Sequence, residues 1–334
     1  MRFLVVGLGS MGKRRVRNLL QLGITDITGF DPRADRRAEA EEKYAIKTEG
    51  DWATAEQLPV DAWIISTPPE THLTYGFKAL DRGCHFFCEA NVTDPRGHEM
   101  VERLKVGKLV GAPSSTMRYF DGPMKMKELL DGGAIGKPLS FTYHSGQYLP
   151  DWHPWESYKD FYVSRRDTGA CREIVPFELS WMVDMLGPVD TLMAMRDKVT
   201  DLDCDIDDVY HLLLRFKSGM LGHLLVDVVS RPAFRLFRIN GSEGSLDWNH
   251  ATNSVRLWTP SGRANDYNET VFNFDMVRQE AGYIHSDQPY EREIADFLAA
   301  IKSERPWPFS FEKDEAVLEL LVRAEKSSDQ GVRA

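Results

Sequence analysis

The chain has 334 residues, 42% hydrophobic and 28% charged, a balance typical of a folded globular protein that excludes a disordered one. Asp and Glu number 51 against 41 Lys and Arg, and the net charge of −10 argues against nucleic-acid binding through bulk electrostatics. No run of about 18 uninterrupted apolar residues occurs, so neither a transmembrane helix nor a membrane partner is expected.

The N-terminus and the cysteines bear on the compartment. The first apolar run is too short for a signal peptide, and Gly7 and Gly9 interrupt it. Cys84 and Cys88 lie in an apolar segment, with no second Cys/His pair at matching spacing, so buried thiols are expected there rather than a metal site. We therefore expect a cytoplasmic protein without a bound metal.

The first 117 residues alternate short apolar segments with helix-forming ones. The apolar segments are typical of buried parallel strands, and Val16, Leu19 and Leu20 mark the inner face of a helix between two of them. The expected strands are 3–6, 27–30, 62–66, 85–88 and 109–111, and further helices are expected at 33–43, 70–82 and 97–105. This order predicts an α/β domain with a doubly wound parallel sheet.

The pattern changes near residue 117. Helices are expected at 123–132, 174–186, 290–303 and 312–327, and strands at 139–148, 191–196, 209–216, 220–229, 235–240 and 255–258. Turn residues separate successive strands, which predicts an open, mostly antiparallel sheet. We therefore expect two domains, 1–117 with the parallel sheet and 118–334 as an α+β domain.

The strongest motif is a G-x-G-x-x-G run that follows the first expected strand and opens a helix. An acidic residue ends the second strand nineteen positions beyond the last glycine, and this full context is specific for a dinucleotide-binding Rossmann turn. The glycines permit the tight turn, the approach of a pyrophosphate and the packing of helix on strand, while the helix N-terminus offers N–H groups to phosphates. The expected phosphate-binding residues are Gly7, Gly9, Ser10, Met11 and Gly12.

The acidic residue is Asp31, which is expected to accept hydrogen bonds from the adenosine ribose. Its charge repels a 2′-phosphate and favours NAD, although Arg33 and Arg36 lie close enough in sequence to accommodate NADP if Asp31 turns away. A cofactor across the carboxyl edge also passes the end of the third strand. The candidates there are Ser66, Thr67, Pro68 and His72, with a helix-cap role for Thr67 and a structural role for His72 as alternatives.

The chain resembles the glucose–fructose oxidoreductase / inositol dehydrogenase / rhizopine-catabolism (Gfo/Idh/MocA) family. The resemblance is carried by the glycine turn, Thr67–His72, Glu89 at the end of the fourth strand, the late turn Gly241–Leu246 and the C-terminal sheet. It implies an NAD(P)-binding domain followed by a domain for substrate binding and oligomerisation. It also implies a sugar, polyol or nucleotide-sugar substrate and assembly into a homodimer or homotetramer through the open sheet.

Two departures from the family pattern concern proton transfer. The family usually has Glu-Lys-Pro after the fourth strand, whereas this chain has Glu89 and Ala90, both still expected beside the cofactor. On the later helix, Glu173 and Phe177 stand where the family has aspartate and histidine. Three readings stay open: an oxidoreductase with substitute residues, a redox-neutral epimerase or lyase with tightly held NAD, and a non-catalytic NAD-binding sensor or scaffold.

We expect substitute acid–base groups in or near the polar, aromatic segment 146–156. His153 has an ordinary pKa near neutrality and Tyr148 carries a phenol, although a structural role for His153 in a proline-flanked loop is an alternative. Glu173 occupies the family's aspartate position. The expected catalytic residues are therefore His153, Glu173 and Tyr148.

Substrate binding is expected from aromatic and charged side chains around the same segments. The candidates are Arg118, Arg172, Asp151, Trp152 and Glu178, with a structural ion pair as the alternative for each arginine and a helix-dipole partner as the alternative for Glu178. Asp203, Asp205, Asp207 and Asp208 lack the spacing of a calcium loop, so a solvated acidic turn is expected there. Lys159, Arg165 and Arg166 are expected to form a solvated basic run, with binding of a substrate diphosphate as the alternative.

Overall fold

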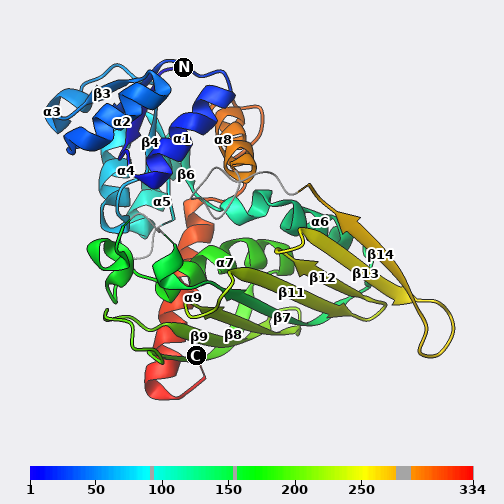
Figure 1. The fold of residues 1–334 in the computed structure, drawn as a ribbon. Helices are drawn as coiled ribbons and strands as arrows, with labels where there is room; N and C mark the ends of the chain where they lie inside the picture. Colours follow the sequence, from blue (N-terminus) through cyan, green and yellow to red (C-terminus); the bar gives the residue numbers. More distant parts are fainter. Residues whose placement is uncertain (91–93, 153–155, 276–286, 334) are drawn as a thin grey trace. The chain divides into compact units, whose positions relative to one another are not determined.

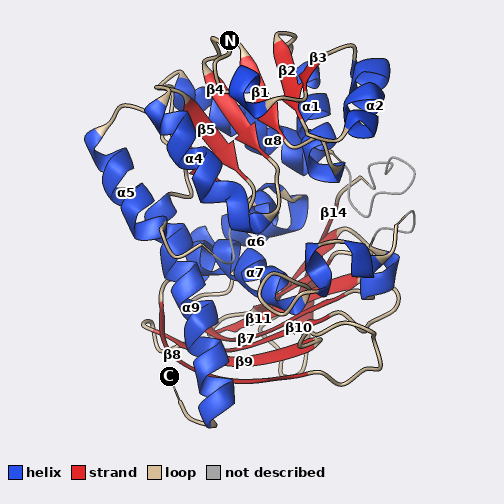
Figure 2. Ribbon diagram, turned by 90° about the vertical axis from the view of Figure 1, so that its left-hand side faces the viewer, coloured by secondary structure: helices blue, strands red, loops and turns tan. Residues whose placement is uncertain are grey.

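The computed structural model describes residues 1–90, 94–152, 156–275 and 287–333 (Figures 1 and 2). The chain divides into two compact units. The first comprises Met1–Thr116 and Asp287–Ala316, and the second comprises Met117–Ser286 and Val317–Ala334. The segment from Asp287 to Ala316, which the sequence analysis grouped with the second domain, thus packs within the first unit.

The first unit contains a six-stranded parallel sheet in the order β3-β2-β1-β4-β5-β6, which confirms the doubly wound architecture. All four residues of β1 and of β4 are buried, because helices cover both faces of the sheet. The strands are β1 (Phe3–Val6), β2 (Ile27–Phe30), β3 (Lys47–Glu49), β4 (Ala62–Ile65), β5 (His85–Cys88) and β6 (Gly111–Pro113).

Helices from both ends of the chain cover this sheet. On one face, Val16 and Leu19 of α1 share a core with Ile294 and Phe297 of α8. On the other face, helices α4 and α5 contribute Leu73, Phe77 and Met100. The helices of the first unit are α1 (Ser10–Gln21), α2 (Ala34–Tyr44), α3 (Trp52–Ala55), α4 (His72–Asp81), α5 (Gly97–Val106) and α8 (Gln288–Ile301).

The second unit contains an eight-stranded sheet in the order β14-β13-β12-β11-β7-β10-β9-β8. Among the described strands of this sheet, only β7 and β10 pair in parallel, so the expectation of a mostly antiparallel sheet is confirmed. The strands are β7 (Pro138–Gly146), β8 (Val189–Asp197), β9 (Val209–Phe216), β10 (Leu221–Asp227), β11 (Phe234–Gly241), β12 (Ser245–Asn249), β13 (Ser254–Pro260) and β14 (Tyr267–Asn273).

One face of this sheet packs on helices α6 and α7 (Figure 2). Tyr143 and Phe237 meet the ring of Trp181 edge-on at centroid distances of 5.7 and 5.4 Å, which forms the centre of the core. The helices are α6 (Asp121–Asp131), α7 (Cys171–Leu186) and α9 (Phe311–Gln330), which begins in the first unit. Short 3-10 helices are η1 (Pro69–Thr71), η2 (Thr116–Tyr119), η3 (Leu149–Asp151), η4 (Tyr158–Asp160) and η5 (Tyr162–Ser164).

Helix α7 begins earlier than expected. The sequence predicts a start at residue 174, but the helix starts at Cys171 and includes Pro176. Backbone hydrogen bonds from Glu173 and Ile174 to the carbonyl of Ala170 establish the first turn before the proline is reached. The earlier start places Glu173 within the first turn of the helix.

The opposite face of the sheet carries apolar side chains that are open to solvent. Alternation along the strands puts Met193, Met195 and Leu213 on this outer face, where 48%, 72% and 57% of each residue is exposed. Leu221 and Leu236 lie on the same face. In the described part of the chain, no helix combines the length and the apolar character needed to cross a bilayer.

Candidate cofactor and substrate sites

The glycine turn between β1 and α1 requires two of its glycines for the fold itself. Gly7 has φ +91°, and a Cβ there would lie 2.5 Å from the carbonyl oxygen of Ser66. A Cβ on Gly12 would lie 1.8 Å from the carbonyl oxygen of Gly7. Any side chain at either position would displace backbone.

Gly9 differs from them because neither its backbone nor the protein interior excludes a side chain. Its φ of −69° is ordinary, and the nearest atom to an added Cβ is Nη1 of Arg36 at 3.5 Å. The first turn of α1 contains Ser10 and Met11, and Gly9 gives it no side-chain cap. A side-chain-free surface therefore fronts a row of N–H donors, which fits the pyrophosphate of a dinucleotide.

Asp31 braces this turn from the end of β2. Its buried carboxylate accepts hydrogen bonds from the backbone N–H of Leu8 and of Arg33, both at 2.9 Å. Arg36 Nη1 lies 3.4 Å from Oδ2 of Asp31, whereas the exposed side chain of Arg33 is paired with Asp35. Of the two arginines expected near the ribose, Arg36 and not Arg33 therefore contacts the Asp31 carboxylate.

The turn after β4 is held by hydrogen bonds around Thr67. The His72 Nε2 donates to the carbonyl oxygen of Thr67 at 2.7 Å, and burial lowers the pKa of His72. The Thr71 hydroxyl donates to the Thr67 hydroxyl at 2.8 Å. His72 is thus a buried residue whose hydrogen bond to Thr67 supports the Ser66–Pro68 segment.

Glu89 follows β5 and is held by a residue that the sequence analysis did not single out. Both oxygens of its carboxylate accept from Arg15 of α1, Nε at 2.7 Å and Nη2 at 2.9 Å. The Ser66 hydroxyl also donates to Glu89 at 3.2 Å. Ala90 comes next and is half-buried. The ends of β4 and β5 are thereby tied together at the carboxyl edge of the sheet.

In the second unit, the predicted residues Tyr148 and Asp151 lie close to Arg231, beyond the ends of the parallel strands β7 and β10. The guanidinium carbon of Arg231, after β10, lies 3.3 Å from the ring centroid of Tyr148, after β7. Arg231 Nε lies 3.9 Å from Oδ2 of the exposed Asp151. Trp152 is half-buried beside them in sequence, and His153 lies outside the described residues.

Glu173 lies in the first turn of α7. Its Oε1 accepts a hydrogen bond from the Tyr162 hydroxyl at 2.9 Å, and both residues are half-buried. A carboxylate joined to a phenol at a helix N-terminus can hold or exchange a proton. Tyr162 had no distinguishing signal in the sequence.

The three remaining substrate candidates take part in ion pairs within the second unit. Arg118 Nη1 lies 2.8 Å from Asp184, and Arg172 Nε lies 2.7 Å from Glu325 of α9. Glu178 is fully buried; Arg235, Tyr143 and Trp181 donate to its two oxygens at 2.8, 2.7 and 2.9 Å respectively. These contacts give Glu178 a structural role in the core.

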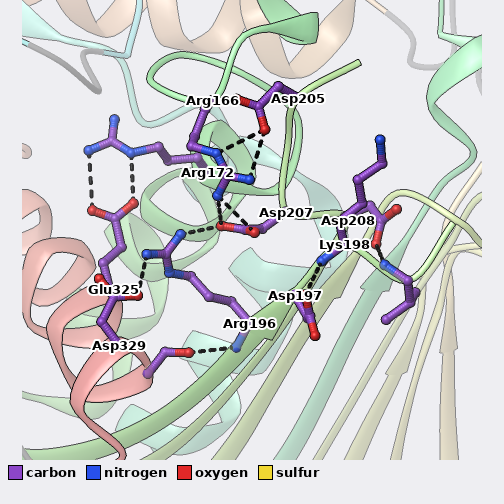
Figure 3. Close-up of polar contacts among 12 residues, drawn as sticks. Arg166, Arg172, Arg196, Asp197, Lys198, Asp205, Asp207, Asp208, Glu325 and Asp329 are labelled. Atoms are coloured by element: carbon purple, nitrogen blue, oxygen red, sulfur yellow. Dashed lines mark hydrogen bonds and ion pairs between the residues drawn. The ribbon is translucent and has the colours of Figure 1, made fainter. Parts of the chain in front are cut away.

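The sequence predicted that the acidic turn 203–208 and the basic residues near 166 would be separate solvated runs. In the structure they instead bind each other (Figure 3). Arg166 contacts Asp205 at 2.8 Å and Asp207 at 3.1 Å, and Asp207 also pairs with Arg196. Asp208 is buried and accepts from the backbone N–H of Val199 at 2.7 Å. Among the residues that the structure describes, no group of three potential ligands could hold a metal ion.

The fold and the glycine turn define the class: an NAD-binding Rossmann oxidoreductase with a second α+β unit. The NAD-binding Rossmann-fold model of the Gfo/Idh/MocA oxidoreductase family matches residues 1–105, and the family's C-terminal domain model matches residues 124–247. Together they match two thirds of the chain. The protein belongs to the Gfo/Idh/MocA family, as the resemblance in the sequence indicated.

Relatives of known name agree with this assignment. The chain is 24% identical to myo-inositol 2-dehydrogenase of Thermotoga maritima, over 99% of this chain and 97% of that protein. It is 30% identical to inositol 2-dehydrogenase of Salmonella typhimurium, over 44% of this chain and 47% of that protein. A solved levoglucosan dehydrogenase in complex with NADH and levoglucosan shares the fold with a TM-score of 0.86 at 18% identity, covering 100% of this chain and 98% of that one.

Proposed function

We propose that this protein is an NAD-dependent dehydrogenase that oxidises a secondary alcohol of a sugar, polyol or nucleotide sugar, or reduces the matching ketone. The glycine turn braced by Asp31 carries this proposal, because it combines an open N–H surface for a pyrophosphate with a carboxylate at the ribose position. NAD, when bound, accepts or supplies the hydride. The inositol dehydrogenase names among the relatives support the substrate class.

We infer a preference for NAD over NADP from the charge at the end of β2. Asp31 is fixed by two backbone N–H groups, so turning it away would break both hydrogen bonds. A 2′-phosphate would therefore meet a negative charge. Arg36 Nη1, 3.4 Å from Asp31, provides partial compensation, which supports weak rather than absent use of NADP.

Oxidation of a carbinol releases one hydride and one hydroxyl proton, so a base is needed in addition to NAD. We propose that Glu173 accepts that proton, with Tyr162 orienting its carboxylate through their 2.9 Å hydrogen bond. Tyr148 and His153 remain candidates for the same step, and Asp151, Trp152 and Arg231 are proposed to bind substrate hydroxyls. Arg118 and Arg172 would contribute only if substrate competed with their carboxylate partners.

We also propose assembly into a homodimer or homotetramer through the outer face of the eight-stranded sheet, in the cytoplasm. The exposed apolar residues Met193, Met195 and Leu213 support the assembly, since such a patch favours burial against protein. All four cysteines are free thiols, which supports a reducing compartment.

The test is turnover with defined probes. Purified protein would be mixed with NAD⁺ or NADP⁺ and with myo-inositol, levoglucosan, glucose, glucuronate or a uridine-diphosphate sugar, and absorbance would be followed at 340 nm. Net NADH formation with one class of these alcohols supports the proposal. Retained cofactor with substrate conversion but no net NADH identifies a redox-neutral enzyme, and cofactor binding without any conversion identifies a sensor.

A further inference from the structure

Arg15 is a fully buried cation in the helix that follows the glycine turn. Its exposed fraction is 0%, and its two-pronged contact with Glu89 uses Nε and Nη2 at 2.7 and 2.9 Å. The guanidinium carbon lies 4.5 Å from the ring centroid of Phe87 and 5.3 Å from that of Tyr290. The aromatic rings and the paired hydrogen bonds leave the guanidinium a single orientation.

A second carboxylate shares the same guanidinium. Arg15 Nη2 lies 2.9 Å from Oε2 of Glu293, which is fully buried in α8. Glu293 also accepts from the Ser114 hydroxyl at 3.0 Å, the Ser115 backbone N–H at 2.7 Å and the Thr116 hydroxyl at 2.7 Å. Arg15 is therefore anchored from behind by a carboxylate that itself has several fixed donors.

A buried ion pair is by itself weak evidence of a contribution to stability. Buried ion pairs can often be replaced by apolar residues without loss of stability, because desolvation of the charges is costly. Burial raises the pKa of Glu293, which shows the same cost at this site. What the network does provide is a fixed position for Glu89, whose side chain keeps 16% of its surface exposed at the carboxyl edge.

The order of strands tells which part of a dinucleotide would lie there. Asp31, directly after β2, marks the ribose on one side of β1, and the pyrophosphate would cross at the start of α1. The nicotinamide half then falls on the other side, at the ends of β4 and β5, where Ser66 and Glu89 are joined. Ala90, the next residue, has no polar side chain to shape this edge.

We propose that Arg15 is a positioning residue for the nicotinamide half of NAD, acting by holding the carboxylate of Glu89 in place at the end of β5. The inference rests on the proposed use of NAD and does not depend on which alcohol is oxidised. Glu89, which Arg15 holds, lies on the β4–β5 side of β1, whereas Asp31 lies on the β2 side. Loss of Arg15 therefore affects binding of the nicotinamide half and spares the adenosine half.

The experiment compares NADH with ADP-ribose, which lacks nicotinamide, by calorimetric titration. Arg15→Met is expected to raise the Kd for NADH about tenfold, within the range for coupled contacts, and to change that for ADP-ribose less than about twofold. In a Glu89→Gln background, Arg15→Met is expected to raise the Kd for NADH further by less than about twofold. Arg15→Lys, which keeps the charge but not the fork, should fall between wild type and Arg15→Met.

Arg14→Met is the matched control. Arg14 is nearly as buried, lies one residue away and forms an ion pair at the start of α8, with Nε 2.9 Å from the N-cap residue Asp287. It should lower the unfolding temperature without changing the NADH-to-ADP-ribose ratio of Kd values. Equal weakening of both ligands by Arg15→Met and Arg15→Lys, or full additivity with Glu89→Gln, overturns the inference.

The outcomes separate this inference from the proposed function. Wild-type protein that binds neither ligand overturns both. Wild-type protein that binds NADH but oxidises none of the alcohols overturns the dehydrogenase assignment, while the ligand comparison still decides the role of Arg15.

Discussion

Alanine at Gly9 and alanine at Gly12 should have different effects, although both residues belong to one motif. An added Cβ at Gly12 would lie 1.8 Å from the Gly7 carbonyl oxygen, so the turn must move. An added Cβ at Gly9 meets only the end of the Arg36 side chain, at 3.5 Å, and the φ of −69° suits alanine. The methyl group introduced by Gly9→Ala would instead occupy the surface expected to face the pyrophosphate.

The expected magnitudes follow from these contacts. Gly9→Ala should reduce the free energy of unfolding by at most about 1 kcal/mol, the cost of a poorer N-cap residue. Gly12→Ala should reduce it by about 3 kcal/mol, as overpacking against backbone does. Losing even one hydrogen bond to a charged phosphate, about 1.5–3 kcal/mol, weakens NAD binding roughly ten- to a hundredfold.

The assay pairs thermal unfolding without cofactor with calorimetric titration by NAD⁺. Gly9→Ala should keep its unfolding temperature within about 4 °C of wild type and lose at least about tenfold in affinity. Gly12→Ala should lose both stability and binding. Wild-type affinity in Gly9→Ala would refute the reasoning, since it would mean that no ligand approaches this surface.

Four further predictions concern other parts of the molecule. Asp31→Ala should raise the NADP-to-NAD ratio of kcat/KM at least about tenfold, because one unit charge near the 2′-phosphate is removed; an unchanged ratio would place the ribose elsewhere. Glu173→Gln should lower kcat about 100-fold while the unfolding temperature stays close to that of wild type, and full activity in this variant would exclude Glu173 as the base. Burial lowers the pKa of His250 to about 4, so the unfolded chain binds more protons between about pH 6.5 and 4, and this contribution to stability, up to about 3 kcal/mol, is lost as the pH falls through that window. In denaturant titrations, His250→Asn should reduce the dependence of the free energy of unfolding on pH between about pH 6.5 and 4. An unchanged pH dependence would contradict the assignment of this effect to His250. Leu213→Lys on the outer sheet face should shift the protein toward monomer in light scattering, whereas an unchanged mass would exclude this face as the interface.

Local patterns predicted the strand–helix–strand unit that carries the candidate cofactor site. Gly7, Gly9, Gly12 and Asp31 lie within one strand–helix–strand unit, whose geometry follows from short-range rules. Most strands of the parallel sheet were predictable for the same reason, since β1 and β4 are continuous buried runs. The edge strand β3 was not expected, because none of its three residues is buried. By contrast, β14 was missed because almost all its residues are exposed and give no alternation of buried and exposed positions.

Long-range partners explain what the sequence could not show. Arg15 and Glu89 are 74 positions apart, and Arg172 and Glu325 are 153 apart, so their pairing depends on the tertiary fold. Glu178 resembled a candidate acid at a helix start, but Arg235 on β11 neutralises it within the core. The acidic turn also lacked any local sign that Arg166 and Arg196 would bind it.

Calorimetric titration of the purified wild-type protein with NAD⁺ and NADP⁺ tests the central claim most directly. The braced glycine turn predicts one saturable site per chain, with NAD⁺ bound more tightly than NADP⁺. Absence of heat with both cofactors, in protein shown to be folded by thermal unfolding, would contradict the account.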